Sequence, residues 1–214
     1  MKIKDIVLSN EGSLNCKSCR YTAYDTMQLS MSFHFSVGIN YMMGDIDSGI
    51  WGVSYLLSTY HRKYPQHFYK PLSALVNGEE LSIEALSKYC CYMDEEYYPL
   101  FSSKRKTVRY LIEKGLKKSK IDKTFDEIFQ TFGLSSDRLD RPICHTGNEK
   151  IRAMAAVGYA HGKQVFCFPW LSQKMVEYYK YHLLWTFDAL ENLGAIVIFP
   201  SGAKEPLRSM DITD

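Results

Sequence analysis

Two short apolar runs near the C-terminal end constrain the fold most, because a long helical segment separates them. The runs are "QVFCFP", which begins at Gln164, and "GAIVIFP", which begins at Gly194. Continuous apolar runs of this length are typical of strands buried in a parallel sheet. The residues from about Ser172 to Asn192 are expected to form the intervening helix. Strand, helix and strand in this order make a βαβ unit, so the sequence predicts an α/β fold with a largely parallel sheet.

The N-terminal part of the chain predicts a second, antiparallel β region. "KIKDIVLS" and "LSMSFHFSV" have strand-like apolar patterns, and Asn77-Gly78 lies between two short apolar runs, which favours a hairpin. "INYMMG" then enters a glycine-containing stretch, and "IWGVSYLLSTYHRKY" after it has apolar residues at helical spacing. We therefore expect strand, glycine turn and helix in succession.

Helices are predicted for the middle of the chain. Residues 104–133 contain "KRKTVRYLIEKGLKK" and "TFDEIFQTFG", in which Gly133 suits a helix end. "GNEKIRAMAAVGYAHG" predicts a further Ala-rich helix that ends at Gly162. Because no repeat and no Pro/Gly/Ser-rich linker divides the chain, we expect one domain over residues 1–214, with a helical insertion at 93–146.

Composition excludes several classes of protein. The 214 residues carry a formal charge of +2, which gives no reason to expect nucleic acid as a partner. No apolar run reaches the length of a membrane span, and the N-terminus lacks the apolar centre of a signal peptide, so a cytoplasmic location is expected. The six cysteines are expected to be reduced thiols. Cys16 and Cys19 form a C-x-x-C, but Cys90 and Cys91 are adjacent and poorly spaced to complete a metal site, so no metal is expected.

The stretch "GDIDSGIWGVS" has the glycine spacing of a phosphate-binding loop but lacks its charged and hydroxyl groups. In the pattern G-x-x-x-x-G-K-[ST] the Lys reaches the terminal phosphates and the hydroxyl holds Mg²⁺. Ile50 stands at the Lys position and Trp51 at the Ser/Thr position. The candidate loop comprises Gly44, Asp45, Asp47, Ser48, Gly49, Ile50 and Trp51. The simpler alternative is a strand-to-helix turn, although backbone N–H groups at a helix N-terminus can still bind an anion.

The order of these segments resembles the ATP-binding cassette (ABC) ATPases over nearly the whole chain. "FHFSVGINYMMGDIDSG" resembles the strands that lead into the phosphate loop, and "YMDEEYYPLFSSKRKTVRYLIEKGL" resembles the glutamine loop and the first helix of the helical subdomain. "HTGNEKIRAMAAVGYAHGKQVFCFPW" resembles the signature and the Walker B strand, and "LENLGAIVIFPSG" resembles the switch strand. The resemblance implies a P-loop NTPase-like ABC cassette.

The resemblance also assigns site positions, and most of them hold unsuitable residues. The signature corresponds to His145, Thr146, Gly147, Asn148 and Glu149. The two Walker B carboxylates correspond to Pro169 and Trp170, and the switch histidine corresponds to Ser201. The glutamine of the glutamine loop corresponds to Asp94 or Glu95. Proline, tryptophan and serine cannot supply the metal ligand, the base or the histidine of the family's hydrolysis. Asp45 and Asp47 add negative charge where a triphosphate would lie. We therefore predict no ATP hydrolysis and no catalytic residue.

The resemblance implies a non-hydrolysing subunit that acts as a partner or scaffold in an ABC-type assembly. It would form a homodimer or a heterodimer with another ABC ATPase subunit, and a membrane permease is a further candidate partner, with location at the inner face of the membrane. No cofactor is expected; ATP with Mg²⁺ stays open. The alternative is a soluble regulatory or binding protein on the same fold.

Further alternatives concern single residues. Trp51 and Trp170 either fill the vacated volume as core or subunit contact, or stack on an aromatic ligand. Tyr21 and Tyr24 lie where the family's adenine-stacking aromatic is found, and "DEEYYPLF" is either a partner contact or an ordinary loop. A third function, an enzyme that uses Cys144 or His145, also stays open.

Overall fold

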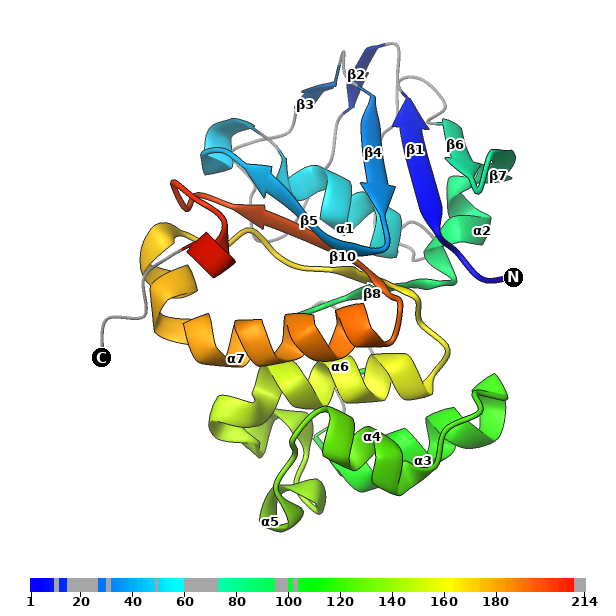
Figure 1. The fold of residues 1–214 in the computed structure, drawn as a ribbon, viewed down its shortest axis with the longest axis vertical. Coiled ribbons are helices and arrows are strands. Elements are labelled where there is room, and N and C mark those ends of the chain that lie inside the picture. Colours follow the sequence, from blue (N-terminus) through cyan, green and yellow to red (C-terminus); the bar gives the residue numbers. More distant parts are fainter. Residues whose placement is uncertain are drawn as a thin grey trace.

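The computed structural model describes residues 1–9, 12–14, 27–29, 32–48, 50–59, 73–94, 100–101 and 104–209. The two main sheets and the helices beside them are arranged in layers. In Figure 1 the antiparallel strands lie at the top, the parallel sheet lies below them, and the helices of the middle of the chain lie at the bottom.

A four-stranded parallel sheet forms the centre of the fold. Its strands follow the order β5 (Gly38–Met43), β10 (Ile196–Ser201), β9 (Val165–Cys167) and β8 (Cys90–Tyr92). Every residue of β10 is buried, as expected for a continuous apolar run between two neighbouring strands. The parallel pairing of β9 with β10 confirms the predicted βαβ unit.

A four-stranded antiparallel sheet adjoins it. The order is β4 (Phe33–Ser36), β1 (Asp5–Ser9), β6 (Ser73–Val76) and β7 (Glu79–Ser82). Asn77 and Gly78 join β6 to β7 with φ angles of 53° and 83°, which are the positive values that a tight hairpin turn requires. A separate pair consists of β2 (Gly12–Leu14) and β3 (Met27–Leu29).

Helices cover both faces of the parallel sheet. On one face α1 (Trp51–Thr59) contacts β8, β9 and β10, and on the other α7 (Gln173–Asn192) contacts β5 and β10. The Ser172 side chain caps the N-terminus of α7, so this helix begins where the sequence predicts it. A short helix, α2 (Ile83–Ser87), packs beside α1.

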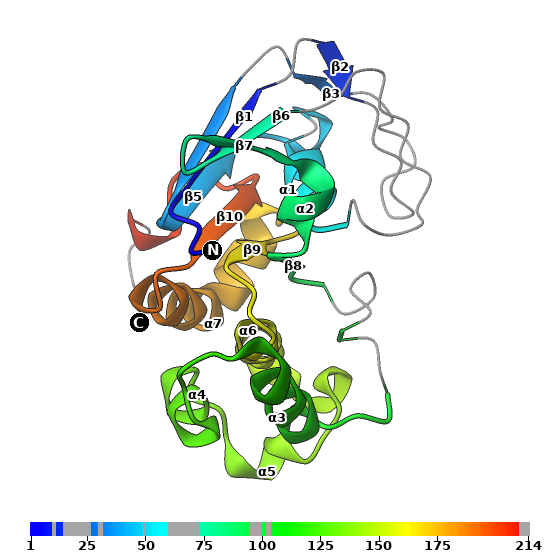
Figure 2. The ribbon, with the colours of Figure 1, turned by 90° about the vertical axis from the view of Figure 1, so that its right-hand side faces the viewer.

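The remaining helices extend away from the sheets on the α7 side (Figure 2). α6 (Lys150–Ala160) packs on α7, and α3 (Val108–Ser119) packs on α6. α4 (Phe125–Thr131) and α5 (Ser136–Leu139) complete this group, and Gly133 has a φ of 56° just after α4. The described residues also form short 3-10 helices: η1 (Ile46–Ser48), η2 (Ile143–His145), η3 (Gly147–Glu149) and η4 (Leu207–Ser209). Within the described ranges, no helix combines the length and the apolar character needed to cross a bilayer.

Candidate functional site

Four of the predicted motif segments meet at one edge of the parallel sheet. The carboxyl ends of parallel strands share an edge, and this is where ligands bind in open α/β sheets. The Gly44 N–H, just past β5, donates to the Ser201 carbonyl at the end of β10 over 2.9 Å. The Met93 N–H, just past β8, donates to the Cys167 carbonyl at the end of β9 over 2.9 Å. The structure therefore brings the loop-like, switch-like and glutamine-like positions to the same edge as the Walker B-like strand.

The phosphate-loop-like segment is folded onto itself. The Ser48 N–H donates to the Asp45 carbonyl over 3.0 Å, and the Ser48 hydroxyl donates to the same oxygen over 2.5 Å. The Ile50 Cδ1 atom lies 3.4 Å from the point where a Cβ on Gly44 would stand. A phosphate cradle needs several backbone N–H groups pointing toward the anion. Ser48 instead uses both of its donors within the loop; Gly49 and the side chain of Asp47 lie outside the described residues.

Trp170 lies across this edge. Its indole Nε1–H donates to the Gly44 carbonyl over 2.9 Å. A Cβ on Gly202 would come within 2.6 Å of Trp170 Cζ2, so the benzo ring lies directly on this glycine. Trp170, at the Walker B-like position, thus contacts two other motif segments. Its Nε1–H binds the loop-like segment at Gly44, and its benzo ring packs on Gly202, next to the switch-like Ser201.

The Ser201 side chain forms hydrogen bonds with backbone groups of the same region. It is fully buried, and its Oγ accepts a hydrogen bond from the Ala203 N–H at 3.0 Å and donates to the Leu171 carbonyl at 3.4 Å. The Gly202 N–H also donates to the Leu171 carbonyl, over 3.0 Å. This side chain therefore holds two backbone segments together.

Trp51 belongs to the core. It is buried on α1, and its ring meets that of Tyr55 edge to face at 6.4 Å. Tyr55 in turn meets Tyr92 of β8 at 5.5 Å. Of the two interpretations offered for Trp51, the structure confirms the core one. The contact across the loop comes from Trp170 instead.

The signature-like segment combines an exposed part with a buried anchor. His145, Gly147 and Asn148 are exposed, whereas Thr146 and Glu149 are buried. The Ser135 N–H and hydroxyl donate to the two Glu149 carboxylate oxygens over 3.0 and 2.6 Å. A carboxylate buried in this way needs hydrogen bonds and compensating charge.

Two arginines supply that charge at ion-pair distance. Arg138 Nη1 lies 3.8 Å and Arg152 Nη2 lies 3.7 Å from Glu149 Oε1. Arg138 also donates to the Thr146 carbonyl over 2.7 Å, which fixes the backbone just before Gly147. Glu149 is therefore a structural residue, and Gly147 and Asn148 form the accessible tip of the segment.

A cavity of about 400 Å³ joins the signature-like segment to the sheet edge. Its lining includes Asp94, Cys144, Gly147, Asn148 and Pro169, together with apolar side chains from α6 and from the start of α7. Cys144 lines the cavity and the neighbouring His145 is exposed, and no hydrogen bond between the two is found within the described residues. The arrangement supplies a mixed polar and apolar pocket rather than an aligned nucleophile and base.

The cysteines that the structure describes are free thiols. Burial and the neighbouring Cys90 raise the pKa of the Cys167 thiol, so it stays protonated and unreactive. In the described ranges no three His, Cys, Asp or Glu side chains cluster as metal ligands would. Cys16, Cys19, Tyr21, Tyr24 and Glu95 lie outside those ranges.

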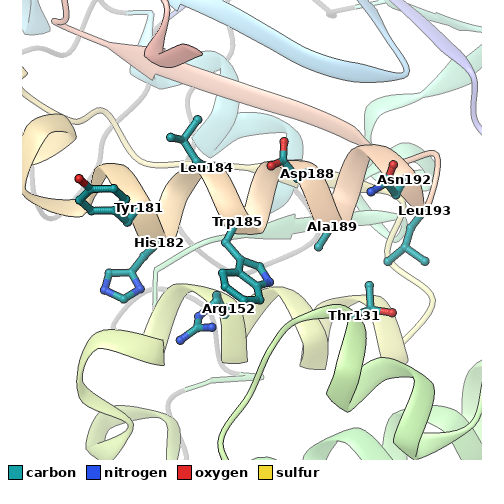
Figure 3. Close-up of a pocket in the computed structure, with 10 residues that line it drawn as sticks. All are labelled: Thr131, Arg152, Tyr181, His182, Leu184, Trp185, Asp188, Ala189, Asn192 and Leu193. Atoms are coloured by element: carbon teal, nitrogen blue, oxygen red, sulfur yellow. The ribbon is translucent and has the colours of Figure 1, made fainter. Parts of the chain in front are cut away.

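A second group of residues, which no motif in the sequence marks, lies on the face of α7 that meets α6. Arg152 and Trp185 contact each other there, and they line a groove of about 890 Å³ (Figure 3). The available signal was Arg152 itself, because it is a charged residue inside the otherwise apolar run "IRAMAAVGYA". Such a residue is either paired in the core or faces a ligand.

Comparisons with known proteins bear on the fold. No protein-family model matches the sequence, and no curated protein matches it. Among solved structures, the chain is similar to a putative ABC transporter ATP-binding protein from Pyrococcus furiosus, with 14% identity, a TM-score of 0.62, and coverage of 94% of this chain and 92% of that one. It is also similar to a bacterial Atm1-family ABC exporter with ATP bound, with 12% identity and a TM-score of 0.57.

That second similarity covers 99% of this chain and 36% of the exporter chain. At these identities the likeness shows the fold alone. The chain therefore has the mixed α/β architecture of ABC ATP-binding proteins, with a parallel sheet, an antiparallel sheet and helices, as the sequence predicted.

Proposed function

We propose that this chain is an ABC-type subunit that does not hydrolyse ATP and that acts as a partner or scaffold in an assembly. The observation that supports the proposal is the contact of Trp170 with Gly44 and Gly202, which puts an indole ring at the sheet edge where the family holds its nucleotide. Within our proposal, residues 93–146 form the helical subdomain of the cassette.

The chemistry of phosphoryl transfer supports the same proposal. That reaction depends on positioned positive charge, a bound Mg²⁺ and a group that orients the attacking nucleophile. Ile50 brings no charge to the loop, and Pro169 and Trp170 bring no metal ligand. The N–H and hydroxyl of Ser48 both donate to the Asp45 carbonyl, so neither is available to a phosphate. The carboxylate of Asp45 would repel a triphosphate. Several functions are thus missing together.

The test is a calorimetric titration of the purified protein with Mg²⁺-ATP, paired with a phosphate-release assay. We expect no heat of binding at millimolar nucleotide and no phosphate above the buffer blank. Thermal unfolding gives an independent check, because a ligand at 100 times its Kd would stabilise the fold by about 2.7 kcal/mol. Micromolar binding accompanied by phosphate release would overturn the proposal.

The accessible tip of the signature-like segment, Gly147 and Asn148, supports a role toward a second subunit. In ABC dimers one subunit's signature meets the nucleotide of the other, so this tip would face a partner's ATP. We propose a homodimer or a heterodimer with an active ABC ATPase subunit, at the inner face of the membrane, with the segment 94–101 toward a permease. Sedimentation of the protein alone, and then with the ATPase subunit encoded beside it, tests the dimer; a monomer in both cases contradicts it.

The groove beside Arg152 favours a second candidate, a regulatory or binding protein that keeps the fold and takes another ligand. Gene neighbourhood separates the two candidates. A permease gene beside this one supports the subunit, and the lack of one supports the binding protein.

A further inference from the structure

One side of α7 exposes a stripe of aromatic side chains. Tyr178, Tyr181 and Trp185 have exposed fractions of 76%, 62% and 51%. They recur at intervals of three and four residues, so they lie on one face of the helix. In Figure 2, α7 lies farther to the left than α6 and α3, at the outer side of the helices. Exposed aromatic side chains gathered in this way are typical of a surface that contacts another protein.

Neighbouring groups hold two of these rings in place. The Tyr178 ring meets that of Tyr179 edge to face, with 4.8 Å between the ring centroids. The Arg152 guanidinium carbon lies 5.1 Å from the Trp185 ring centroid. A Cβ on Gly133 would come 2.4 Å from Trp185 Cζ2, so the ring rests directly on that glycine. Aromatic side chains that are fixed before binding lose little entropy in a contact, and they are common among the residues that carry binding energy.

The stripe has a positive charge at one end and a net negative charge at the other. Lys174 is exposed in the first turn of α7, and none of the ion pairs in the described ranges includes it. At the other end, Arg208 Nη2 lies 2.7 Å from Asp188 Oδ1 and 2.6 Å from Glu191 Oε2. Two carboxylates share one guanidinium there, so this end of the stripe carries one net negative charge.

A second copy of the stripe complements the first in the antiparallel direction. Lys174 and Asp188 each lie seven residues from Tyr181, which is about 10.5 Å along a helix. A two-fold axis at Tyr181 therefore brings Lys174 of one copy opposite Asp188 of the other. The same axis places Tyr178 opposite Trp185, because these two lie three and four residues from Tyr181. A parallel alignment would instead set like charges against each other at both ends.

We propose that two copies of this chain associate through an antiparallel contact between their α7 helices, with Tyr181 on the two-fold axis. This contact is separate from the dimer proposed above, because Trp185 and Asp188 do not line the cavity beside Gly147 and Asn148. One helix of each copy buries less than the roughly 1,600 Å² of a standard interface. We therefore expect a reversible dimer with a Kd of about 10–100 µM.

Sedimentation velocity of the purified protein from about 5 to about 500 µM tests the contact, because this range brackets the expected Kd. Trp185→Ala and Tyr178→Ala each remove a ring from the contact, and each is expected to weaken the dimer at least tenfold. A monomer throughout the range overturns the proposal. A dimer of unchanged Kd in Trp185→Ala also overturns it, because that dimer forms through another face; this second outcome leaves the proposed function untouched.

Charge reversal tests the antiparallel alignment. Lys174→Glu and Asp188→Lys each set like charges against each other at both ends of the contact, and each is expected to weaken the dimer at least fivefold at low salt. The double variant Lys174→Glu/Asp188→Lys restores opposite charges, so its Kd is expected to return to within about threefold of the parent value. Lack of recovery in the double variant contradicts the antiparallel contact.

Tyr110→Ala is the matched control for the aromatic substitutions. Tyr110 is a 47% exposed aromatic on α3, with Lys114 Nζ 5.8 Å from its ring centroid, and it lies outside the stripe. We expect this variant to dimerise with the Kd of the parent protein. A loss equal to that of Trp185→Ala contradicts the proposed surface. Circular dichroism of each variant confirms that it is folded.

Discussion

Trp170 links two segments at the carboxyl edge of the parallel sheet. Its Nε1–H and its benzo ring contact two segments that are far apart in sequence, at Gly44 and at Gly202. A side chain larger than hydrogen at position 202 would occupy the volume of the indole, which explains why glycine suits this position next to a tryptophan.

We predict that Gly202→Ala destabilises the protein by about 1–3 kcal/mol, the usual cost of overpacking a closely packed site. The new Cβ would lie 2.6 Å from Trp170 Cζ2, so the indole must move and lose its bond to Gly44. Urea denaturation measures the change in the free energy of unfolding. In a Trp170→Ala background the same substitution is expected to cost much less, because the clash has gone. An equal cost in both backgrounds would contradict the contact.

A second residue-scale prediction concerns Glu149. Glu149→Gln replaces one acceptor oxygen with a donor that faces Ser135, and it removes the negative charge beside Arg138 and Arg152. Because the residue is buried, we expect a loss of about 1–3 kcal/mol in the free energy of unfolding. Glu113→Gln, at an exposed position of α3, is the control and is expected to stay within about 0.5 kcal/mol. Similar values for the two variants would show that Glu149 is not an anchor.

At the scale of elements, the sequence predicts the long, strongly patterned segments well. The helix expected from Ser172 to Asn192 spans Gln173–Asn192, and the Asn77-Gly78 hairpin is present. These elements follow from local signals, a capping serine and a turn dipeptide. β8 and α2 were not predicted, because their three and five residues are too few to show a periodic pattern of apolar residues.

The crossing of α3 and α6 yields an element-scale prediction. A Cβ on Gly115 of α3 would meet His161 Cδ2 at 2.6 Å and the Ala160 carbonyl carbon at 2.7 Å. Alanine favours a helix over glycine by up to about 1 kcal/mol, but backbone atoms cannot move aside as a flexible side chain can. We expect Gly115→Ala to lower the melting temperature, and Lys117→Ala, at an exposed position of the same helix, to leave it nearly unchanged. A rise in the melting temperature of Gly115→Ala would show that the helices are not in close contact.

At the scale of the whole molecule, segment order predicts which motifs share the sheet edge, but not what fills it. Parallel strands bring Gly44, Ser201 and Met93 to one edge, and this follows from topology. The contact of Trp170 with Gly44 joins residues 126 positions apart, and the pairing of Arg152 with Trp185 joins two helices. Such contacts depend on packing across the fold, which no local pattern in the sequence specifies.

The stability of the molecule is expected to fall as the pH drops from 7.5 to 5.5. Burial lowers the pKa of His161 and of His182, so the native state resists their protonation. An unfolded histidine titrates near pH 6.5. Above that pH both states are neutral and the full stability is present. Below it the unfolded chain takes up protons first, and stability is lost until the native pKa values are reached.

Burial is the largest influence on both pKa values, and the neighbouring groups act in both directions. Around His161, Lys163, Lys114 and Lys118 oppose a positive charge, whereas the Leu111 carbonyl, 3.1 Å from Nε2, favours one. Around His182, Arg152 and Arg138 oppose a positive charge, and Glu149 favours one. Urea titrations at pH 7.5 and 5.5 measure the difference. His161→Gln can keep a hydrogen bond to Leu111 without the titration, so it should flatten the pH dependence, and the exposed His145→Gln should not. An unchanged slope in His161→Gln would show that this buried imidazole does not contribute to the acid sensitivity of the fold.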